Sequence, residues 1–264
     1  MKVQDRNAGN LLTIEKLTAG YGTRSVISGV ELSISAGEIV TVIGANGVAK
    51  TTLLRTAAGL IPPLAGRIFI AGEDISAMSE ARRARLLALC LTERMAADRM
   101  NGFEVVSMGR YPYTGRFGTL REEDRRKVTE VMEQVGIGAL AKMPFPTMSD
   151  GQKQLVRLAR ACAQEPKLLL LDEPTSYLDI SHKLELVGIV KQLAAQQDMA
   201  VLASLHELEL AFLLSDRILG LSREGRMACL GTPEAVFADE GIARLYGLDR
   251  GRLKELYAGF AEVL

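Results

Sequence analysis

Short, continuous apolar runs recur along the chain and predict strands that are buried on both faces. Ile39–Ile43 is apolar apart from Thr41, and Lys167–Asp172 and Ala200–Leu205 have the same character. Residues 182–197, which lie between the last two runs, predict a helix. Because strands that alternate with helices build a mainly parallel sheet with crossover connections, we expect an α/β fold.

The first third of the chain predicts more strands than helices. Turn residues at 19–22 and 36–37 divide it into apolar segments. A short helix then follows the strand that ends at Ile43. The predicted strands of this part are Leu11–Leu17, Ser25–Ile34, Glu38–Ile43 and 66–71.

The middle of the chain, residues 76–165, is rich in charge and predicts mostly helices. Glu122–Val135 is amphipathic, since its valines and Met132 fall at helical spacing. Gln152–Ala163 predicts a second helix. The apolar run Leu86–Leu91 interrupts this pattern and predicts a strand.

Composition places the chain among ordinary globular proteins. Of its 264 residues, 48% are hydrophobic and 24% are charged, which excludes a disordered or collagen-like chain. Lys plus Arg and Asp plus Glu both number 32, so a broad surface for nucleic acid or an anionic membrane is not expected. No apolar run approaches the roughly 18–20 residues that cross a bilayer, and the polar N-terminus does not resemble a secretory signal. We expect a soluble protein that reaches a membrane only through a partner.

Three cysteines and one histidine are interpreted as structural residues. Cys90, Cys162 and Cys229 share no CxxC spacing, so we expect reduced, buried side chains rather than a metal site or a redox dithiol. His182 fits no motif and is interpreted as a surface residue of the helix at 182–197.

A glycine-bearing loop between the strand Ile39–Ile43 and the next helix predicts a phosphate-binding loop. Backbone N–H groups and a helix N-terminus face phosphate oxygens in such a loop. Lys50 would neutralise the β and γ phosphates, and the Thr51 hydroxyl would bind Mg²⁺. The alternative is a turn that merely precedes a helix. The loop consists of Gly44, Ala45, Asn46, Gly47, Val48, Ala49, Lys50, Thr51 and Thr52.

The loop departs from the usual G-x-x-x-x-G-K-[ST] pattern at Ala49, which stands where the second glycine belongs. A Cβ at this position would crowd the phosphate, or would fit if φ there is helical. Both outcomes stay open at the level of the sequence.

A second motif supports the loop. The buried strand at Leu168 ends in two carboxylates, Asp172 and Glu173, followed by Pro174. Asp172 is placed to hold Mg²⁺ through its water shell, and Glu173 to polarise a water that attacks the γ-phosphate. Ligands of open α/β sheets bind outside the carboxyl ends of the strands, which agrees with both placements.

A third segment, Met148–Gln154, resembles the LSGGQ signature of the ABC ATPases, and it lies between the other two motifs as in that family. Ser176–Asp179 is similar to the D-loop of the family. His206 is similar to its switch histidine, and Tyr21 to the aromatic residue that stacks on adenine.

The resemblance implies a fold. ABC ATPases have a P-loop NTPase (RecA-like), mainly parallel core, an N-terminal antiparallel β subdomain and an inserted helical subdomain. We therefore expect one ABC ATPase domain at 11–247, with the helical subdomain inserted at about 94–162. Residues 248–264 are expected to form a helical tail.

The resemblance also implies ATP and Mg²⁺ as ligands and ATP hydrolysis as the activity. Two copies would close head to tail on two ATP molecules, with the signature of one copy at the γ-phosphate bound by the other. Lys50, Glu173 and His206 are the catalytic candidates. Besides the loop 44–52, the nucleotide-binding candidates are Tyr21, Ser149, Gly151, Gln152 and Asp179.

Three of these residues have ordinary structural alternatives. His206 would be a plain histidine at a strand end, although the acidic Glu207 after it favours the switch role. Tyr21 would fill a turn. Asp179 would cap the helix that follows, alone or in addition to its D-loop role.

Two further positions depart from the family pattern. Asp150 replaces the first glycine of the signature, as a helix cap or as a negative charge close to ATP. The family also places a Mg²⁺-sensing Gln after a strand, where this chain has Thr92 and Glu93. Either would stand in for it, and Glu93 is the candidate metal ligand.

The kind of ABC protein is suggested by softer signals. Arg110–Gly115 and Leu120–Asp124 resemble the importers of iron–siderophore, haem and cobalamin, although a Pro/Gly turn with exposed aromatic rings would explain the first segment equally. The importer interpretation implies membrane permease subunits, an extracytoplasmic substrate-binding protein and a peripheral place on the cytoplasmic side of the plasma membrane. The alternatives are a soluble ABC ATPase of the iron–sulphur assembly type and a nucleotide-gated interaction module with impaired hydrolysis.

Overall fold

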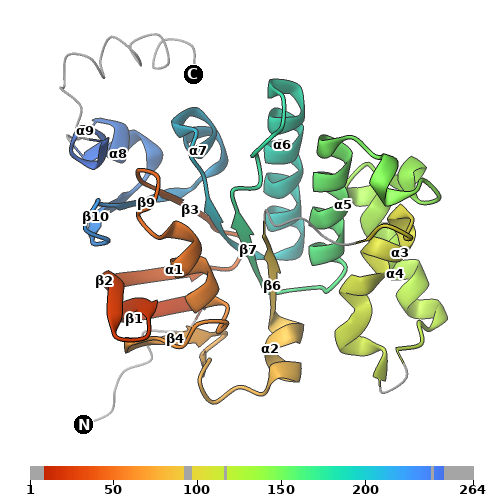
Figure 1. Cartoon of the computed structure of the whole chain (residues 1–264), viewed down its shortest axis with the longest axis horizontal. Coiled ribbons are helices and arrows are strands. Elements are labelled where there is room, and N and C mark those ends of the chain that lie inside the picture. Colours follow the sequence, from red (N-terminus) through yellow and green to blue (C-terminus); the bar gives the residue numbers. More distant parts are fainter. Residues whose placement is uncertain (1–8, 92–96, 116–117, 239–240, 247–264) are drawn as a thin grey trace.

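A computed structural model describes residues 9–91, 97–115, 118–238 and 241–246 (Figure 1). The larger of the two sheets in these residues is mixed, because its edge strand β10 runs antiparallel to β9 while the other neighbours are parallel. The predicted mainly parallel α/β fold is confirmed. The order across this sheet is β10 (Met227–Gly231), β9 (Arg217–Leu221), β3 (Ile39–Ile43), β8 (Ala200–Ser204), β7 (Leu168–Asp172) and β6 (Leu87–Cys90).

The smaller sheet is antiparallel and belongs to the N-terminal part of the chain. The turn predicted at 19–22 is wrong for residues 19–21, since β1 continues to Tyr21 and pairs there with Arg24. A Cβ on Gly20 would lie 2.0 Å from the Arg24 carbonyl oxygen, so this glycine permits a close approach of two strands. The order is β2 (Arg24–Ser35), β1 (Asn10–Tyr21), β4 (Ala65–Ile70) and β5 (Glu73–Asp74).

Helices connect and cover the strands. The predicted strand Leu86–Leu91 is shorter than expected, because Leu86 ends the helix that precedes β6. Most of Arg110–Gly115, for which a Pro/Gly turn was the alternative, belongs to a 3₁₀ helix, Met108–Tyr113. The α-helices of the described residues are α1 (Lys50–Ala57), α2 (Glu80–Leu86), α3 (Gly102–Ser107), α4 (Glu122–Gln134), α5 (Asp150–Cys162), α6 (Ile180–Gln197), α7 (Leu208–Leu214), α8 (Pro233–Ala238) and α9 (Gly241–Tyr246).

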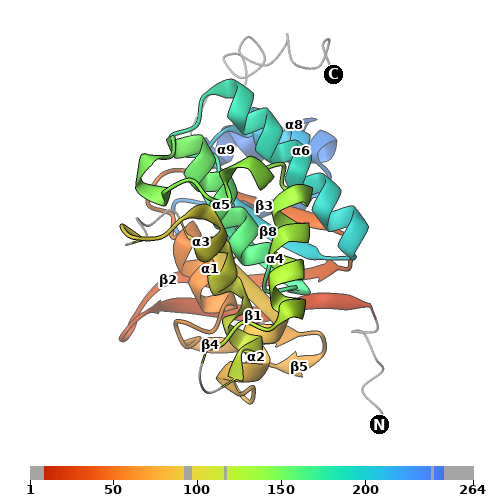
Figure 2. The same cartoon turned by 90° about the vertical axis from the view of Figure 1, so that its right-hand side faces the viewer.

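Helices α3, α4 and α5, together called the helical region, lie beyond the β6 edge of the larger sheet (Figure 1) and face the viewer in Figure 2. The predicted bounds 11–247 and 94–162 stay predictions, and the predicted tail at 248–264 lies outside the described residues. Across the described part of the chain, no helix has the length and apolar character to cross a membrane.

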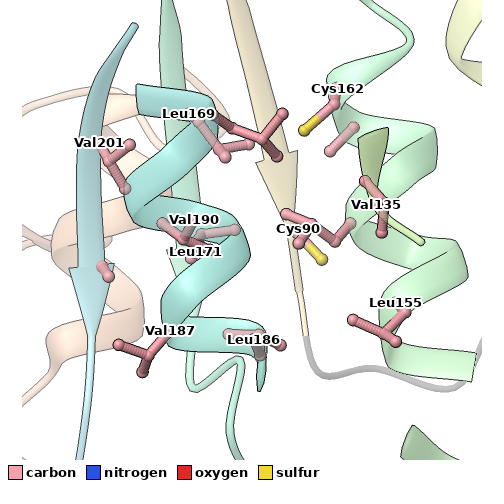
Figure 3. Packing of buried hydrophobic residues seen from close by; sticks show 14 of the residues in the cluster. Cys90, Val135, Leu155, Cys162, Leu169, Leu171, Leu186, Val187, Val190 and Val201 are labelled. Atoms are coloured by element: carbon pink, nitrogen blue, oxygen red, sulfur yellow. The ribbon is translucent and has the colours of Figure 1, made fainter. Parts of the chain in front are cut away.

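Neighbouring residues of the buried strands face opposite layers of the core. In β7, Leu168 and Leu170 pack in the layer that holds α1 and the antiparallel sheet. Leu169 and Leu171 pack in the layer that holds α5 and α6 (Figure 3). Because both faces of the strand are covered, its sequence is apolar throughout rather than alternating.

The cysteines lie at two depths. Cys90 and Cys162 are buried between β6 and α5 (Figure 3), and burial raises the pKa of the Cys162 thiol to about 12. The expectation of burial is wrong for Cys229, which is half-buried because β10 is an edge strand. All three are free thiols.

A buried ion-pair cluster joins the 3₁₀ helix, α4 and the turn that leads from α5 to β7. The Arg110 side chain donates from Nε to Asp124 Oδ1 at 3.0 Å, and from Nη1 to the Ala163 carbonyl at 2.9 Å and Glu165 Oε2 at 2.6 Å. Its guanidinium carbon lies 4.1 Å from the centre of the Tyr113 ring. These contacts meet at the corner where α5 runs into β7.

Candidate active site

The loop from Gly44 to Thr52 leads from the carboxyl end of β3 into α1. Gly44 has φ of 152°, and a Cβ there would lie 2.6 Å from the Leu221 carbonyl oxygen, so only glycine fits. Gly47 has φ of 83° and open space where a side chain would be. The loop therefore wraps closely against β9 on one side and presents bare backbone on the other.

Ala49 is the strained residue of this loop. Its φ is 67° and its ψ is 30°, which is the left-handed region, so the alternative that φ is helical in the ordinary right-handed sense is wrong. It precedes α1 without a side-chain cap, and its carbonyl accepts from the Leu53 N–H at 3.0 Å. A non-glycine residue in this conformation costs about 1–2 kcal/mol.

Ala49→Gly is therefore expected to stabilise the protein by about 1 kcal/mol, because glycine adopts positive φ without strain. The melting temperature should rise by about 2–4 °C. Thermal unfolding measured by circular dichroism tests this.

The matched control is Ala58→Gly at the other end of α1, where φ is −79° and right-handed. That change should lower the melting temperature, because glycine costs about 1 kcal/mol in a right-handed helical conformation. A melting temperature that falls in both variants would contradict the strain argument.

Lys50 begins α1 and is buried. Its Nζ donates to the Gly44 carbonyl at 2.9 Å and lies 3.4 Å from His206 Nδ1. Burial lowers the pKa of Lys50, although the charges of Glu173 and Asp172 act to raise it. The loop thus holds a desolvated ammonium group for which an anion would be a better partner than a carbonyl.

Asp172 ends β7 beside this loop. Its Oδ1 accepts from the Thr51 hydroxyl at 3.1 Å and from the Ser204 hydroxyl at 2.8 Å. A carboxylate and a hydroxyl are oxygen ligands of the kind Mg²⁺ takes, so these residues fit the expected metal. Ser204 is a site residue that sequence analysis missed, although it is the polar position inside the apolar run at 200–205.

Glu173 follows Asp172 with a φ of 47°, again left-handed. Its N–H donates to the Ser204 hydroxyl at 3.0 Å, which holds this conformation. The Glu173 carboxylate accepts from the Ser176 hydroxyl at 3.3 Å and from His206 Nε2. Because lysine only donates and carboxylate only accepts, these contacts fit His206 protonated on Nε2, with Nδ1 facing Lys50.

Tyr21 lies at the edge of this group. Its hydroxyl lies 3.4 Å from the Thr52 hydroxyl, and 55% of the residue is exposed. An exposed aromatic ring beside the loop is available for stacking on a planar ligand.

The signature residues form a second group at the start of α5. Ser149 is the N-cap: its hydroxyl accepts from the Gln152 N–H, and Gln152 Oε1 accepts from the Ser149 N–H. The cap interpretation of Asp150 is therefore wrong, since Asp150 is an exposed residue of the first turn. Gly151 is buried.

Asp179 caps α6, because its Oδ1 accepts from the His182 N–H at 2.9 Å. This bears out the capping alternative. His182 lies on that helix as expected, but its ring also packs on Gly151. Thr92 and Glu93, the candidates for the missing Gln and the metal, lie outside the described residues.

Comparisons with known proteins agree on one family. The family model described as ABC transporter matches residues 27–176. An uncharacterised ABC transporter ATP-binding protein of Methanocaldococcus jannaschii is 39% identical over 95% of this chain and 86% of that protein. The ferric enterobactin transport ATP-binding protein of Escherichia coli is 36% identical over 89% of this chain and 86% of that protein.

Solved structures give the same result. CbiO1 of Clostridium perfringens, part of an ABC transporter complex, matches with a TM-score of 0.78 and 26% identity. The match covers 95% of this chain and 99% of that one.

Proposed function

Because this chain belongs to the ABC transporter family and is an ATP-binding, ATP-hydrolysing member of it, we propose that it is the motor subunit of an importer of metal chelates. Iron–siderophore, haem and cobalamin complexes are the substrate class. The similarity to the ferric enterobactin transport protein of Escherichia coli supports an iron chelate among these.

The observation that carries the proposal is that Lys50, Asp172, Glu173 and His206 meet at the carboxyl ends of three neighbouring strands. Lys50 exchanges the Gly44 carbonyl for phosphate oxygens, and Glu173 accepts the proton of the attacking water. His206 holds the Glu173 carboxylate in place. Thr51 and Asp172 would hold Mg²⁺, which neutralises charge on the phosphates.

The signature group supports a head-to-tail homodimer. Ser149 contacts Gln152 of the same helix, and Gly151 contacts His182. Lys50 of the phosphate loop contacts Gly44 instead, so the two groups make separate contacts within one copy. The start of α5 is a helix N-terminus, which favours an anion. A second copy, turned by a two-fold axis, would bring this helix to the phosphates held by the first.

Met108 and Tyr111 offer a surface for the permease. They lie on the 3₁₀ helix after α3, with 45% and 77% of each residue exposed. Two large apolar residues exposed on one short helix would give the permease an apolar contact point. A substrate-binding protein on the far side of the membrane would deliver the chelate to the permease.

The test is co-purification from the native host. We expect the tagged chain to sediment with membranes, to be released by alkaline carbonate, and to co-purify in mild detergent with a polytopic membrane protein. Met108→Ser combined with Tyr111→Ser should weaken that association while ATP turnover of the isolated chain persists. Stable soluble partners in place of a polytopic protein would favour the iron–sulphur assembly type of ABC ATPase.

A further inference from the structure

The first turn of α6 touches the signature helix through an unassigned residue, His182. A Cβ placed on Gly151 would lie 2.8 Å from Cδ2 of the His182 ring and 3.2 Å from its Nε2. Gly151 itself has an ordinary helical backbone. A side chain at this position of α5 would therefore require the imidazole ring to move, whereas the backbone conformation itself would accept it.

Asp179 binds both the backbone N–H and the ring of His182. Its Nδ1 lies 2.8 Å from Asp179 Oδ1, the same oxygen that accepts from the His182 N–H at 2.9 Å. These hydrogen bonds lower the pKa of Asp179, so the carboxylate stays charged and continues to bind the His182 ring. The bond through Nδ1 leaves the Cδ2–Nε2 edge toward Gly151. The His182 side chain is 39% exposed, so it lies at the surface of α6 as expected from the sequence, with one ring edge against Gly151.

The next residue along α6, Lys183, contacts a different partner. Lys183 Nζ donates to Glu207 Oε1 at 2.7 Å, and the Thr175 hydroxyl donates to Glu207 Oε2 at 3.0 Å. Glu207 directly follows His206, which contacts Glu173. The first turn of α6 thus contacts both the signature helix and the loop of the switch histidine.

We propose that His182 is a positioning residue for the hydrolytic reaction: it holds Gly151 at a set distance from Asp179, so that the signature helix and the start of α6 move as one body. This inference rests on the proposed function, because it concerns the closed state in which the signature meets phosphate. Among the described residues, the contacts of His182 are with Asp179 and Gly151 and not with the phosphate loop 44–52, so we expect its effect on turnover rather than on ATP binding to that loop.

The first experiment compares steady-state ATP turnover and equilibrium ATP binding in His182→Ala, His182→Asn and the parent. Asn keeps a donor for Asp179 but lacks the ring edge. We expect kcat to fall about tenfold in both variants, with ATP affinity and KM within twofold of the parent. Ser181→Ala, an exposed residue of the same turn, is the control and should match the parent.

Unchanged kcat in both His182 variants, with an active parent, would overturn the inference and leave the proposed function intact. A joint loss of kcat and ATP affinity would also overturn it, because that pattern is expected of a misfolded site. A parent that hydrolyses no ATP would instead contradict the proposed function itself, and the inference with it.

A stability cycle tests the contact independently of ATP. Gly151→Ala should lower the melting temperature of the parent, because the new methyl group meets the imidazole ring. The same change in the His182→Ala background should raise the melting temperature, since the ring is gone and alanine is favoured over glycine in a helix by about 1 kcal/mol. Equal changes in both backgrounds would show that His182 does not set the distance to Gly151, and the inference would fail.

Discussion

Glu173→Gln is expected to bind ATP as tightly as the parent and to hydrolyse it about a thousandfold more slowly, within the range that a general base contributes. The amide keeps the shape of the side chain and can still face His206, but it cannot accept a proton from water. Phosphate release under saturating Mg-ATP measures the loss.

The same variant should accumulate as a dimer, because ATP that is not hydrolysed stays in contact with the phosphate loop of one copy and the signature helix of the other. Size-exclusion chromatography with light scattering, with and without Mg-ATP, gives the readout. Glu185→Gln, at an exposed position of α6, is the control. It should hydrolyse ATP as the parent does and show the same monomer–dimer equilibrium as the parent. A Glu173→Gln chain that stays monomeric at saturating ATP would contradict the head-to-tail dimer, and retained turnover would contradict the role of Glu173 as base.

Lys50→Met is expected to weaken ATP binding about a hundredfold, since charge-assisted hydrogen bonds contribute about 1.5–3 kcal/mol. The thioether fills the space of the lysine stem without a charge to meet the phosphates. Titration calorimetry measures the affinity, and Lys142→Met, at an exposed position, is the control. Unchanged affinity in Lys50→Met would overturn the phosphate-loop assignment.

Alkaline titration adds a second signature of Lys50. Burial lowers the pKa of this ammonium group below its usual 10.5, so the empty loop loses its charge at a lower pH than a free lysine would. As the pH is raised, the ATP affinity of the parent should therefore start to decrease before pH 10.5 is reached. ATP itself is fully charged over this range. In Lys50→Met this part of the pH dependence should be absent.

Complete burial made some strands predictable, although β9 (Arg217–Leu221), which is buried at four of its five residues, was not predicted. Ile39–Ile43 and Leu168–Asp172 are apolar because both faces of each strand are covered, and both were predicted with correct bounds or nearly so. β10 was not predicted, because Met227–Gly231 is an exposed to half-buried edge strand without an apolar run. β1 is longer than predicted. Gly20 indicated a turn in the sequence, but in the structure it allows β1 and β2 to approach closely.

The site was predictable where chemistry follows a local motif. Lys50 and Asp172 stand in such motifs, and the structure brings them together. Ser204 belongs to no motif, and its role depends on the pairing of β8 with β7, which a sequence does not show. The left-handed backbone of Ala49 was equally hidden, because a loop's φ is set by where the chain must go next.

The hydrogen bonds and ion pairs of Arg110 hold one end of α5, so a rotation of this helix moves its other end the furthest. Arg110 fixes the end of this helix at Ala163, so a rotation of the helical region would turn about that corner. With 13 residues, α5 is about 20 Å long, and a swing of about 10° would carry Ser149, at its other end, through about 3.5 Å. A small angular change at the sheet would thus displace the tip of α5 by more than the length of a hydrogen bond, and the start of α6 would have to move with it for the contact between His182 and Gly151 to persist.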